Sequence, residues 1–190
     1  APLKIINAFP PPMQYSESPY GVGNSQGGNA ISAHEEDGQH LGPQGILVFH
    51  DYDMGMAHAK KINKPVVLDF TGHACVNCRK MEEQVWSAAH VKNTLANDVV
   101  LISLYVDERI DLPKEQQYET TMAGKTKKVK TTGDKWMVLQ ANSYGTNSQP
   151  YYVFLNHDEE TLVENANYQD YGTVDLFTDW LNRGLQEFKK

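Results

Sequence analysis

Cysteine is scarce in this chain, which has only Cys75 and Cys78 among 190 residues. Two cysteines three positions apart cannot form a framework of structural disulfides, so stability must come from a hydrophobic core. The length suffices for one domain with such a core. Basic charge is also in deficit, since 17 lysines and arginines stand against 24 acidic residues and the formal net charge is −7. We therefore expect no phosphate-binding surface and no nucleic-acid partner.

Long apolar runs are absent as well. The longest, Val99 to Val106, is interrupted by Ser103 and has the length of a strand, whereas a membrane helix needs about 20 apolar residues. The chain begins at Ala1 and lacks the basic and apolar segments of a signal peptide at its start. We expect a soluble domain cut from a longer protein, whose membrane part would lie upstream.

Residues 1–44 are rich in proline and glycine and poor in apolar side chains. Such a segment cannot bury enough surface to fold by itself, and we interpret it as a linker or a strap. The domain proper is expected at residues 45–190 and should open with a strand at Ile46 to Phe49. A helix to about Asn63 should follow. Its expected cap and buried residues are Asp51 or Asp53, Met54, Ala57 and Ile62.

Both cysteines fall in the stretch after this helix. An apolar, β-branched run from Val66 to Phe70 predicts a buried strand, and Thr71 to Ala74 predict the turn that leaves it. Within that strand, Asp69 shares a face with apolar neighbours, so we expect it to be buried. From Cys75 onward the pattern is helical, which places this sulfur at a helix N-terminus, where free N–H groups and the helix dipole stabilise a thiolate. Cys78 follows one turn later, within reach of a reversible disulfide.

Three other interpretations of the cysteine pair are weaker. Tetrahedral zinc needs about four ligands, and the seven scattered histidines would have to supply the remainder. Covalent haem attachment needs a histidine directly after the second cysteine, where this chain has Arg79. A purely structural disulfide would close too short a loop to constrain the unfolded chain. We therefore expect a redox pair and no cofactor or metal besides the Cys75–Cys78 disulfide itself.

The later part of the chain predicts a second half of the sheet. Val99 to Val106 should form a buried strand in a βαβ unit, after a helical piece that Ser87 caps and that turns Val91 and Leu95 inward. Residues 107–147 look like an insertion. Its expected elements are a basic hairpin over residues 118–132 and a short helix over residues 136–142. Four lysines of this hairpin are interpreted as a solvated arm.

A final hairpin and helix complete the prediction. Gln149 and Pro150 lead into a strand at Tyr151 to Leu155, and Thr161 to Glu164 should form the returning strand. Thr173 should then cap a helix that covers one face of the sheet. Its expected contacts are Val174, Phe177, Trp180, Leu181 and Phe188.

This order of elements resembles the thioredoxin fold over residues 46–190, an α/β fold with a central mixed β-sheet flanked by helices. Asp69 lies six residues before Cys75, as the buried acid of thioredoxins does, and Gln149-Pro150 falls at the place of their cis-proline. Thioredoxins usually carry tryptophan before the first cysteine, where this chain has Ala74.

Two shorter stretches, Lys64 to Asp69 and Cys75 to Glu82, are similar to the C-terminal periplasmic domain of the DsbD thiol:disulfide interchange protein family. In that family an acid also stands four residues after the second cysteine, as Glu82 does here. The resemblance implies a protein-disulfide reductase with a periplasmic location, a role in cytochrome c biogenesis, and electrons supplied by the membrane part of the same protein. Its implied acceptors are periplasmic thioredoxin-like proteins.

The implied mechanism is an exchange of disulfides in which Cys75 attacks and Cys78 resolves the mixed disulfide. Asp69 would relay the proton of Cys78, and Glu82 would place a second carboxylate near the pair, so that Cys75 has a less depressed pKa than in strongly oxidising relatives. The residues expected to meet the substrate are His73, Ala74, Gln149 and Pro150. The alternative is a thioredoxin-like module that senses redox state or binds a partner without turnover.

Overall fold

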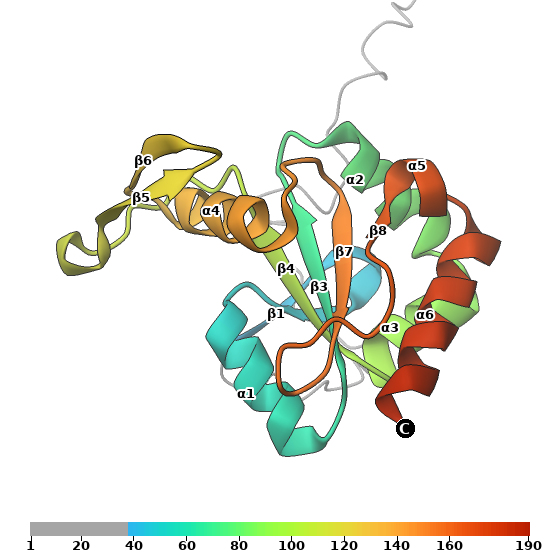
Figure 1. Ribbon diagram of the computed structural model, residues 1–190. Helices are drawn as coiled ribbons and strands as arrows, with labels where there is room; N and C mark the ends of the chain where they lie inside the picture. The colour runs from blue at the N-terminus through green and yellow to red at the C-terminus, as the bar shows by residue number, and fades with distance from the viewer. Residues whose placement is uncertain (1–37) are drawn as a thin grey trace, which may run out of the picture. The chain divides into compact units, whose positions relative to one another are not determined.

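The computed structural model describes residues 38–190, whose centre is a six-stranded mixed sheet with helices on both faces (Figure 1). Its order is β1-β2-β4-β3-β7-β8; the β2–β4 and β3–β4 pairs are parallel and the other three are antiparallel. The strands are β1 (Gln39–Leu41), β2 (Leu47–Phe49), β3 (Val66–Thr71), β4 (Val100–Tyr105), β7 (Tyr151–Leu155) and β8 (Ala166–Asn167). The expected architecture, a mixed sheet flanked by helices, is confirmed.

The two apolar strands lie at the centre of this sheet, as predicted from the βαβ pattern. Every residue of β3 is buried, because β4 and β7 pair with its two edges and helices cover both faces. Strand alternation sends Leu68 and Phe70 to one face and Val67 to the other. Both faces of β3 therefore contribute to a hydrophobic core.

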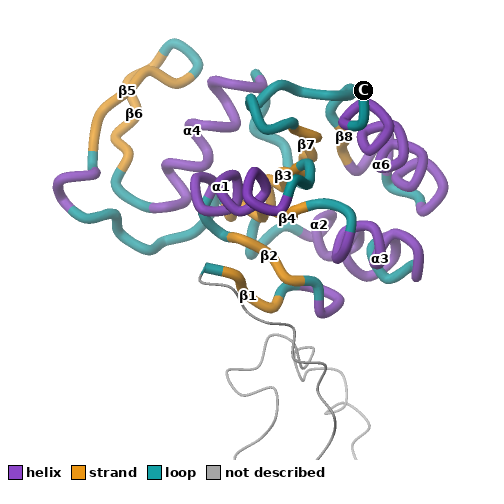
Figure 2. The backbone as a smooth tube through the Cα atoms, turned by 90° about the horizontal axis from the view of Figure 1, so that it is seen from below, coloured by secondary structure: helices purple, strands orange, loops and turns teal. Residues whose placement is uncertain are grey.

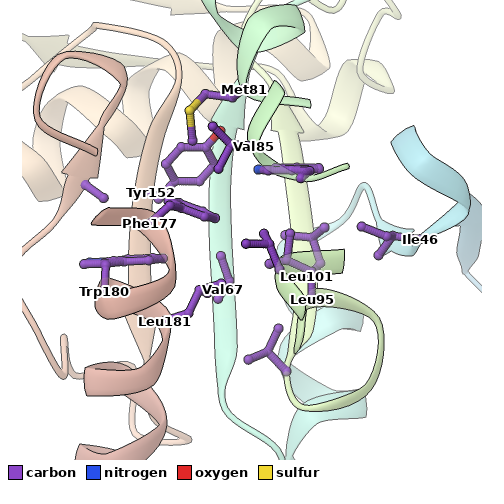
Figure 3. Packing of buried hydrophobic residues seen from close by; sticks show 14 of the residues in the cluster. Ile46, Val67, Met81, Val85, Leu95, Leu101, Tyr152, Phe177, Trp180 and Leu181 are labelled. Atoms are coloured by element: carbon purple, nitrogen blue, oxygen red, sulfur yellow. The ribbon is translucent and has the colours of Figure 1, made fainter. Parts of the chain in front are cut away.

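The two faces carry separate helical layers (Figure 2). One layer consists of α1 (Tyr52–Ile62) and α4 (Thr132–Tyr144), which bury Met56, Ala59 and Trp136. The opposite layer contains a π-helix, η4 (Met81–Val85), together with α3 (Ala89–Asn97) and α6 (Val174–Phe188). Its core surrounds Tyr152 of β7 (Figure 3). The largest side chains packed there are Trp86, Trp180, Phe154 and Phe177.

Helix α1 starts as predicted, but its buried face differs from the prediction. The Asp51 carboxylate accepts a hydrogen bond from the Met54 amide at 3.0 Å and so caps the helix. Met54 itself is 44% exposed, and Ala57 is exposed too, so the predicted face was wrong for both. The helix instead turns Gly55 toward the sheet, where an added Cβ would lie 2.5 Å from Ile102 Cδ1. Because glycine has no apolar side chain, a glycine that allows the helix to approach the sheet gives no hydrophobic signal in the sequence.

The prediction that Ser87 caps the helix after the cysteine stretch was also wrong. Ala88 is the N-cap residue of α3, and the Ser87 hydroxyl instead donates to the Glu83 carbonyl at 2.7 Å. Serine can bond to a carbonyl one turn earlier as readily as it caps a helix. The inward residues Val91 and Leu95 are buried as predicted.

The sheet begins earlier than residue 45. Strand β1 pairs with β2, although it lies within the segment interpreted as a linker. The next turn, η3 (Pro43–Gly45), places the Gln44 side chain where its Nε2 donates to the Glu82 carbonyl at 3.0 Å. Main-chain pairing needs no apolar side chains, so composition did not reveal it. The rest of the linker prediction, residues 1–37, lies outside the described residues.

The inserted hairpin is confirmed and projects from the body beside α4 (Figure 1). It consists of β5 (Tyr118–Met122) and β6 (Lys125–Val129), preceded by the short 3-10 helix η5 (Lys114–Gln116). Helix α4 is longer than predicted because Thr131 and Asp134 form a reciprocal capping box at its start.

The returning strand predicted at Thr161 to Glu164 was wrong. Thr161 makes a single bridge to Leu155, and the strand that pairs with the outer edge of β7 is β8, before the short helix α5 (Tyr168–Tyr171). The Glu164 carbonyl accepts a bond from Trp180 Nε1 at 2.7 Å instead of a ladder bond. A bond to helix α6 therefore takes the place of strand pairing at Glu164. None of the helices in this described part is long and apolar enough to cross a membrane.

Candidate active site

Polar side chains gather on one face of the sheet where β3 and β4 end. Asp69 pairs in register with Ser103, and Thr71 pairs with Tyr105. Because alternate strand residues point to one side, all four face the layer of η4, α3 and α6. The first three are each 2% exposed or less. A buried polar patch therefore lies at the end of β3 from which the cysteine loop departs.

The two cysteines form a disulfide at the start of helix α2 (Val76–Lys80), with their Cα atoms 5.3 Å apart. Cys75 is the N-cap residue and is half-buried, whereas Cys78 is 1% exposed. The Cys78 amide donates to Cys75 Sγ over 3.2 Å. A free helix N–H group thus points at the more accessible sulfur, where it would stabilise a thiolate after reduction.

The carboxyl group of Asp69 is buried and incompletely satisfied. The Ser103 hydroxyl donates to its Oδ2 at 3.0 Å, and Oδ1 has no hydrogen-bond partner among the described residues. Burial raises the pKa of Asp69 to about 7, against smaller opposing contributions from the Ser103 bond and from Arg79. At neutral pH this carboxyl can therefore accept or release a proton.

Glu82 is a second buried acid, and it lies on the helical turn after the cysteines. Its side chain is buried, with 4% of the residue exposed, whereas a charged residue on a helix is usually solvated; its effect on the cysteine pair stays a prediction. Its Oε1 accepts a hydrogen bond from Arg79 Nη2 at 2.7 Å. Burial raises the pKa of Glu82 to about 8, although Arg79 lowers it; Asp69 adds to the rise.

The helix changes type at this acid. From Met81 the helix widens into η4, where the Trp86 amide donates to the Met81 carbonyl, five residues earlier. Met81, Glu82 and Val85 are all buried there. Such π-turns are rare and occur frequently at functional sites. The spacing of its apolar residues is the same as in an α-helix, so the sequence did not predict this turn.

The loop before Cys75 is held by the loop after β4. Asp107 accepts hydrogen bonds from the amides of His73 at 2.8 Å and Ala74 at 3.0 Å. Although burial raises it, these two bonds bring the pKa of Asp107 below its ordinary value. His73 also contacts Glu108 at 3.0 Å and stacks on Tyr105, with ring centroids 4.2 Å apart. His73 and Ala74 are both exposed beside the disulfide, where a partner could reach them.

Gln149 and Pro150 lie at the same end of the sheet. The peptide bond between them is cis, and the next residue, Tyr151, pairs with Phe70 of β3. Gln149 Nε2 donates to Gln140 Oε1 at 2.8 Å, which anchors this segment to α4. The register places the pair next to the end of β3, but their contact with a substrate stays a prediction.

Four residues of the site were not singled out from the sequence: Thr71, Arg79, Ser103 and Tyr105. Ser103 carried a signal, because it is the one polar residue in an apolar run, as Asp69 is in the strand before it. Arg79 carried none, since a cation on a helix is usually solvated. Residues 38–190 contain no cluster of three or more histidine, cysteine or acidic side chains that could hold a metal ion.

A sheet end that carries a Cys-x-x-Cys disulfide at a helix start, above a buried acid, supports a thiol-disulfide oxidoreductase. The sequence matches the thioredoxin-like domain family over residues 52–181. The chain belongs to this family. The thioredoxin-like fold predicted from the sequence is thereby confirmed.

The chain is also similar to solved structures. A DsbH oxidoreductase is 20% identical over 72% of this chain and 82% of its own, with a TM-score of 0.52. A thioredoxin from Thermus thermophilus has 20% identity over 72% and 85%, with a TM-score of 0.49. The reduced DsbD C-terminal domain of Neisseria meningitidis has 18% identity over 70% and 92%, with a TM-score of 0.48. A comparison with curated protein sequences gives no match.

Proposed function

We propose that this domain is a protein-disulfide reductase that passes electrons from an upstream donor to disulfides of partner proteins. The observation that carries the proposal is the difference between its two sulfurs. Cys75 is accessible, and its Sγ accepts a hydrogen bond from the Cys78 amide, whereas Cys78 is buried one turn further along the helix. One sulfur can therefore meet a partner, and the other can only meet its neighbour.

The reaction begins with both cysteines reduced. The Cys75 thiolate attacks a disulfide of the partner, which breaks that bond, forms a mixed disulfide and releases one partner thiolate. Cys78 then loses its proton and attacks Cys75 Sγ. The Cys75–Cys78 disulfide forms, and the second partner sulfur leaves and takes up a proton. In all, two electrons pass to the partner, and its two thiolates take up two protons, which balance those that Cys75 and Cys78 release to solvent and to a base.

The buried acids would serve the second step. Cys78 is too buried to lose its proton directly to bulk water. Asp69 lies on the face of the sheet that η4, the continuation of the cysteine helix, covers, and its pKa of about 7 suits exchange of a proton at neutral pH. We therefore assign Asp69 as the proton relay and Glu82 as the group that adjusts it. Because both pKa values are raised, the two acids oppose the Cys75 thiolate less at pH 7 than two full charges would.

A protein partner also suits the surroundings of Cys75. Val76, the next residue, is 68% exposed, and Ile110 of the loop after β4 is 65% exposed. Val76 therefore offers an apolar contact to a partner protein directly after the reactive cysteine in the chain. Two stretches of the chain, Lys64 to Asp69 and Cys75 to Glu82, resemble the DsbD family. This resemblance supports a periplasmic role, a membrane-bound donor and thioredoxin-like acceptors, including those of cytochrome c biogenesis.

Turnover tests the proposal. The domain, supplied with a dithiol and a protein disulfide, should reduce many equivalents, whereas a sensing or binding module would stop after one. Cys78→Ser should accumulate a mixed disulfide with the partner, and Cys75→Ser should not. Failure of the wild type to turn over would refute the reductase.

A reduction potential measured against glutathione decides the direction. A value near about −270 mV, as in thioredoxin, supports a reductase, and one near about −120 mV indicates an oxidant.

A further inference from the structure

Arg79 influences both buried acids of the site. Its Nη2 donates to Glu82 Oε1 at 2.7 Å and to Thr71 Oγ1 at 3.2 Å. The side chain is only 18% exposed, and that of Glu82 is 5% exposed. An ion pair this far from water is screened much less than one at the surface.

The two bonds join different elements of the fold. Thr71 is the last residue of β3, two positions after Asp69 and on the same face, whereas Glu82 belongs to the π-turn after the cysteines. Arg79 therefore ties the strand that carries one acid to the turn that carries the other. Its guanidinium lowers the pKa of both acids, and each would rise further without it.

We propose that Arg79 is a positioning residue of the exchange reaction, which fixes Glu82 against the end of β3 and keeps one carboxylate of the buried pair ionised. The inference rests on the proposed function, since it assigns the group that prepares the acceptor of the Cys78 proton. Two buried carboxylates close together cannot both be ionised at low cost, but one cation offsets one negative charge. The pair then holds one carboxylate, ready to take a proton, and one neutral acid.

The proton balance shows why this charge is needed. When Cys78 attacks Cys75 Sγ, a sulfur–sulfur bond forms, the bond to the partner breaks, and the proton of Cys78 must move to a base. Without Arg79, the pKa values of both acids would lie higher, so less of the pair would be ionised at neutral pH and able to act as a base. The partner sulfur leaves as a thiolate and takes its proton from solvent.

Within residues 38–190, the other groups that influence the pair carry no positive charge. Strand β4 contributes Ser103 and Tyr105, and β7 contributes Tyr152; burial raises the pKa of both tyrosines, so both remain neutral. The π-turn adds Glu83, whose charge raises the pKa of Glu82. The two cysteines do not titrate while they are joined.

The test begins with the oxidised protein, in which the titration of the buried carboxyl groups is followed by infrared or carboxyl NMR spectroscopy. A modest loss of interaction free energy shifts a pKa by one unit. Arg79→Gln removes the cation, so it should raise the apparent pKa values of the pair by about one unit or more. Arg79→Lys keeps the charge and should restore most of the wild-type titration. Lys80→Gln is the matched control, because it removes the same charge from the exposed neighbouring residue.

The kinetic readout uses the reduced protein and a protein disulfide. In Arg79→Gln, the rate of the second step should fall about ten-fold at pH 7 and recover at higher pH, as one unit implies. A purely structural role would lower the rate at every pH and leave the profile in place. The carboxyl titration does not depend on turnover, so failure of the reductase would be seen separately from failure of this inference.

An unchanged titration in Arg79→Gln, or an equal shift in Lys80→Gln, would overturn the proposal. If Arg79→Gln does not fold, Glu82→Gln is compared with the double variant Arg79→Gln/Glu82→Gln, in which no unpaired Glu82 charge is buried. The pKa of Asp69 should then be higher in the double variant. Equal values in the two proteins would also overturn the proposal.

Discussion

At the scale of single residues, the site is defined by a carboxyl group that the fold buries against its solvation preference. Asp69 is 2% exposed and receives one neutral hydrogen bond, from Ser103. A raised pKa for a buried acid means that folding favours its protonated form, which costs stability when the solution is more alkaline. This loss of stability arises at the residue that the proposed reaction uses as its proton acceptor.

Asp69→Asn should change the dependence of stability on pH. In the unfolded chain Asp69 ionises at its ordinary pKa of 3.8, and in the folded protein at about 7. Between these values the folded state holds the extra proton, so the free energy of unfolding of the wild type falls as pH rises, by at most about 4 kcal/mol. Asparagine does not ionise, so the variant should gain up to that amount relative to wild type between pH 4 and pH 8.

Urea denaturation of the oxidised protein across this pH range measures the effect. Asp158→Asn, at an exposed position, is the control and should track the wild type. Parallel profiles for Asp69→Asn and wild type would contradict the assignment of a buried, titrating Asp69.

Ser103→Ala should weaken the same site from the neighbouring strand. The variant removes the donor to Asp69 Oδ2 and leaves that buried oxygen without a partner. We expect a loss of about 1–3 kcal/mol in the free energy of unfolding. The bond favours the ionised acid, so its loss should also raise the pKa of Asp69 and make the variant most destabilised above pH 7. Carboxyl NMR reports the shift; a titration identical to that of wild type would remove Ser103 from the site.

At the scale of elements, hydrophobic periodicity predicted most of the structure. The buried strands β3 and β4, the strand β7 and the helix α6 all follow from runs and spacings of apolar residues. What periodicity missed was set by the main chain or by contacts distant in sequence. Edge strand β1 needs only backbone pairing, and the π-turn η4 leaves the apolar pattern of its sequence almost unchanged.

The predicted packing of α6 on the sheet did not include its close approach to β7, because that approach depends on a glycine. A Cβ added at Gly184 would lie only 2.3 Å from Phe154 Cδ2, and the ring of Phe154 is fully buried. Gly184→Ala should therefore lower the free energy of unfolding by about 1–3 kcal/mol through overpacking, although alanine alone favours a helix by about 1 kcal/mol. Asn182→Ala, on the exposed side of the same helix, should stay within about 0.5 kcal/mol of wild type. Thermal and urea unfolding would distinguish them; a neutral or stabilised Gly184→Ala would contradict the close packing.

At the scale of the whole domain, the sequence located the reactive end of the sheet but not its full chemistry. The spacing of Asp69 and Cys75 and the Gln149-Pro150 pair were enough to predict where β3, α2 and β7 meet. Arg79 was missed because its role depends on the depth at which helix α2 lies on the sheet. Local pattern predicts elements well, whereas the pairing of buried charges depends on their packing.

The inserted hairpin is the part of the domain that the site does not use. It forms its own two-stranded sheet, and its contacts run to α4, where Asn142 Nδ2 donates to the Thr121 carbonyl at 3.1 Å and Lys127 pairs with Asp134. These are surface interactions, each worth about 1 kcal/mol or less. The redox chemistry should therefore be independent of the outer hairpin.

Replacement of residues 120–127 by Asn-Gly tests this independence. The variant keeps the pair Glu119 and Lys128 in register and closes it with a two-residue turn. The free energy of unfolding should fall by no more than about 2 kcal/mol, and reduction of the Cys75–Cys78 disulfide by a small dithiol should keep its wild-type rate. If exchange with a small dithiol slowed as well, the hairpin would be coupled to the site through α4. If only exchange with a protein partner slowed, the hairpin would be a docking arm for that partner.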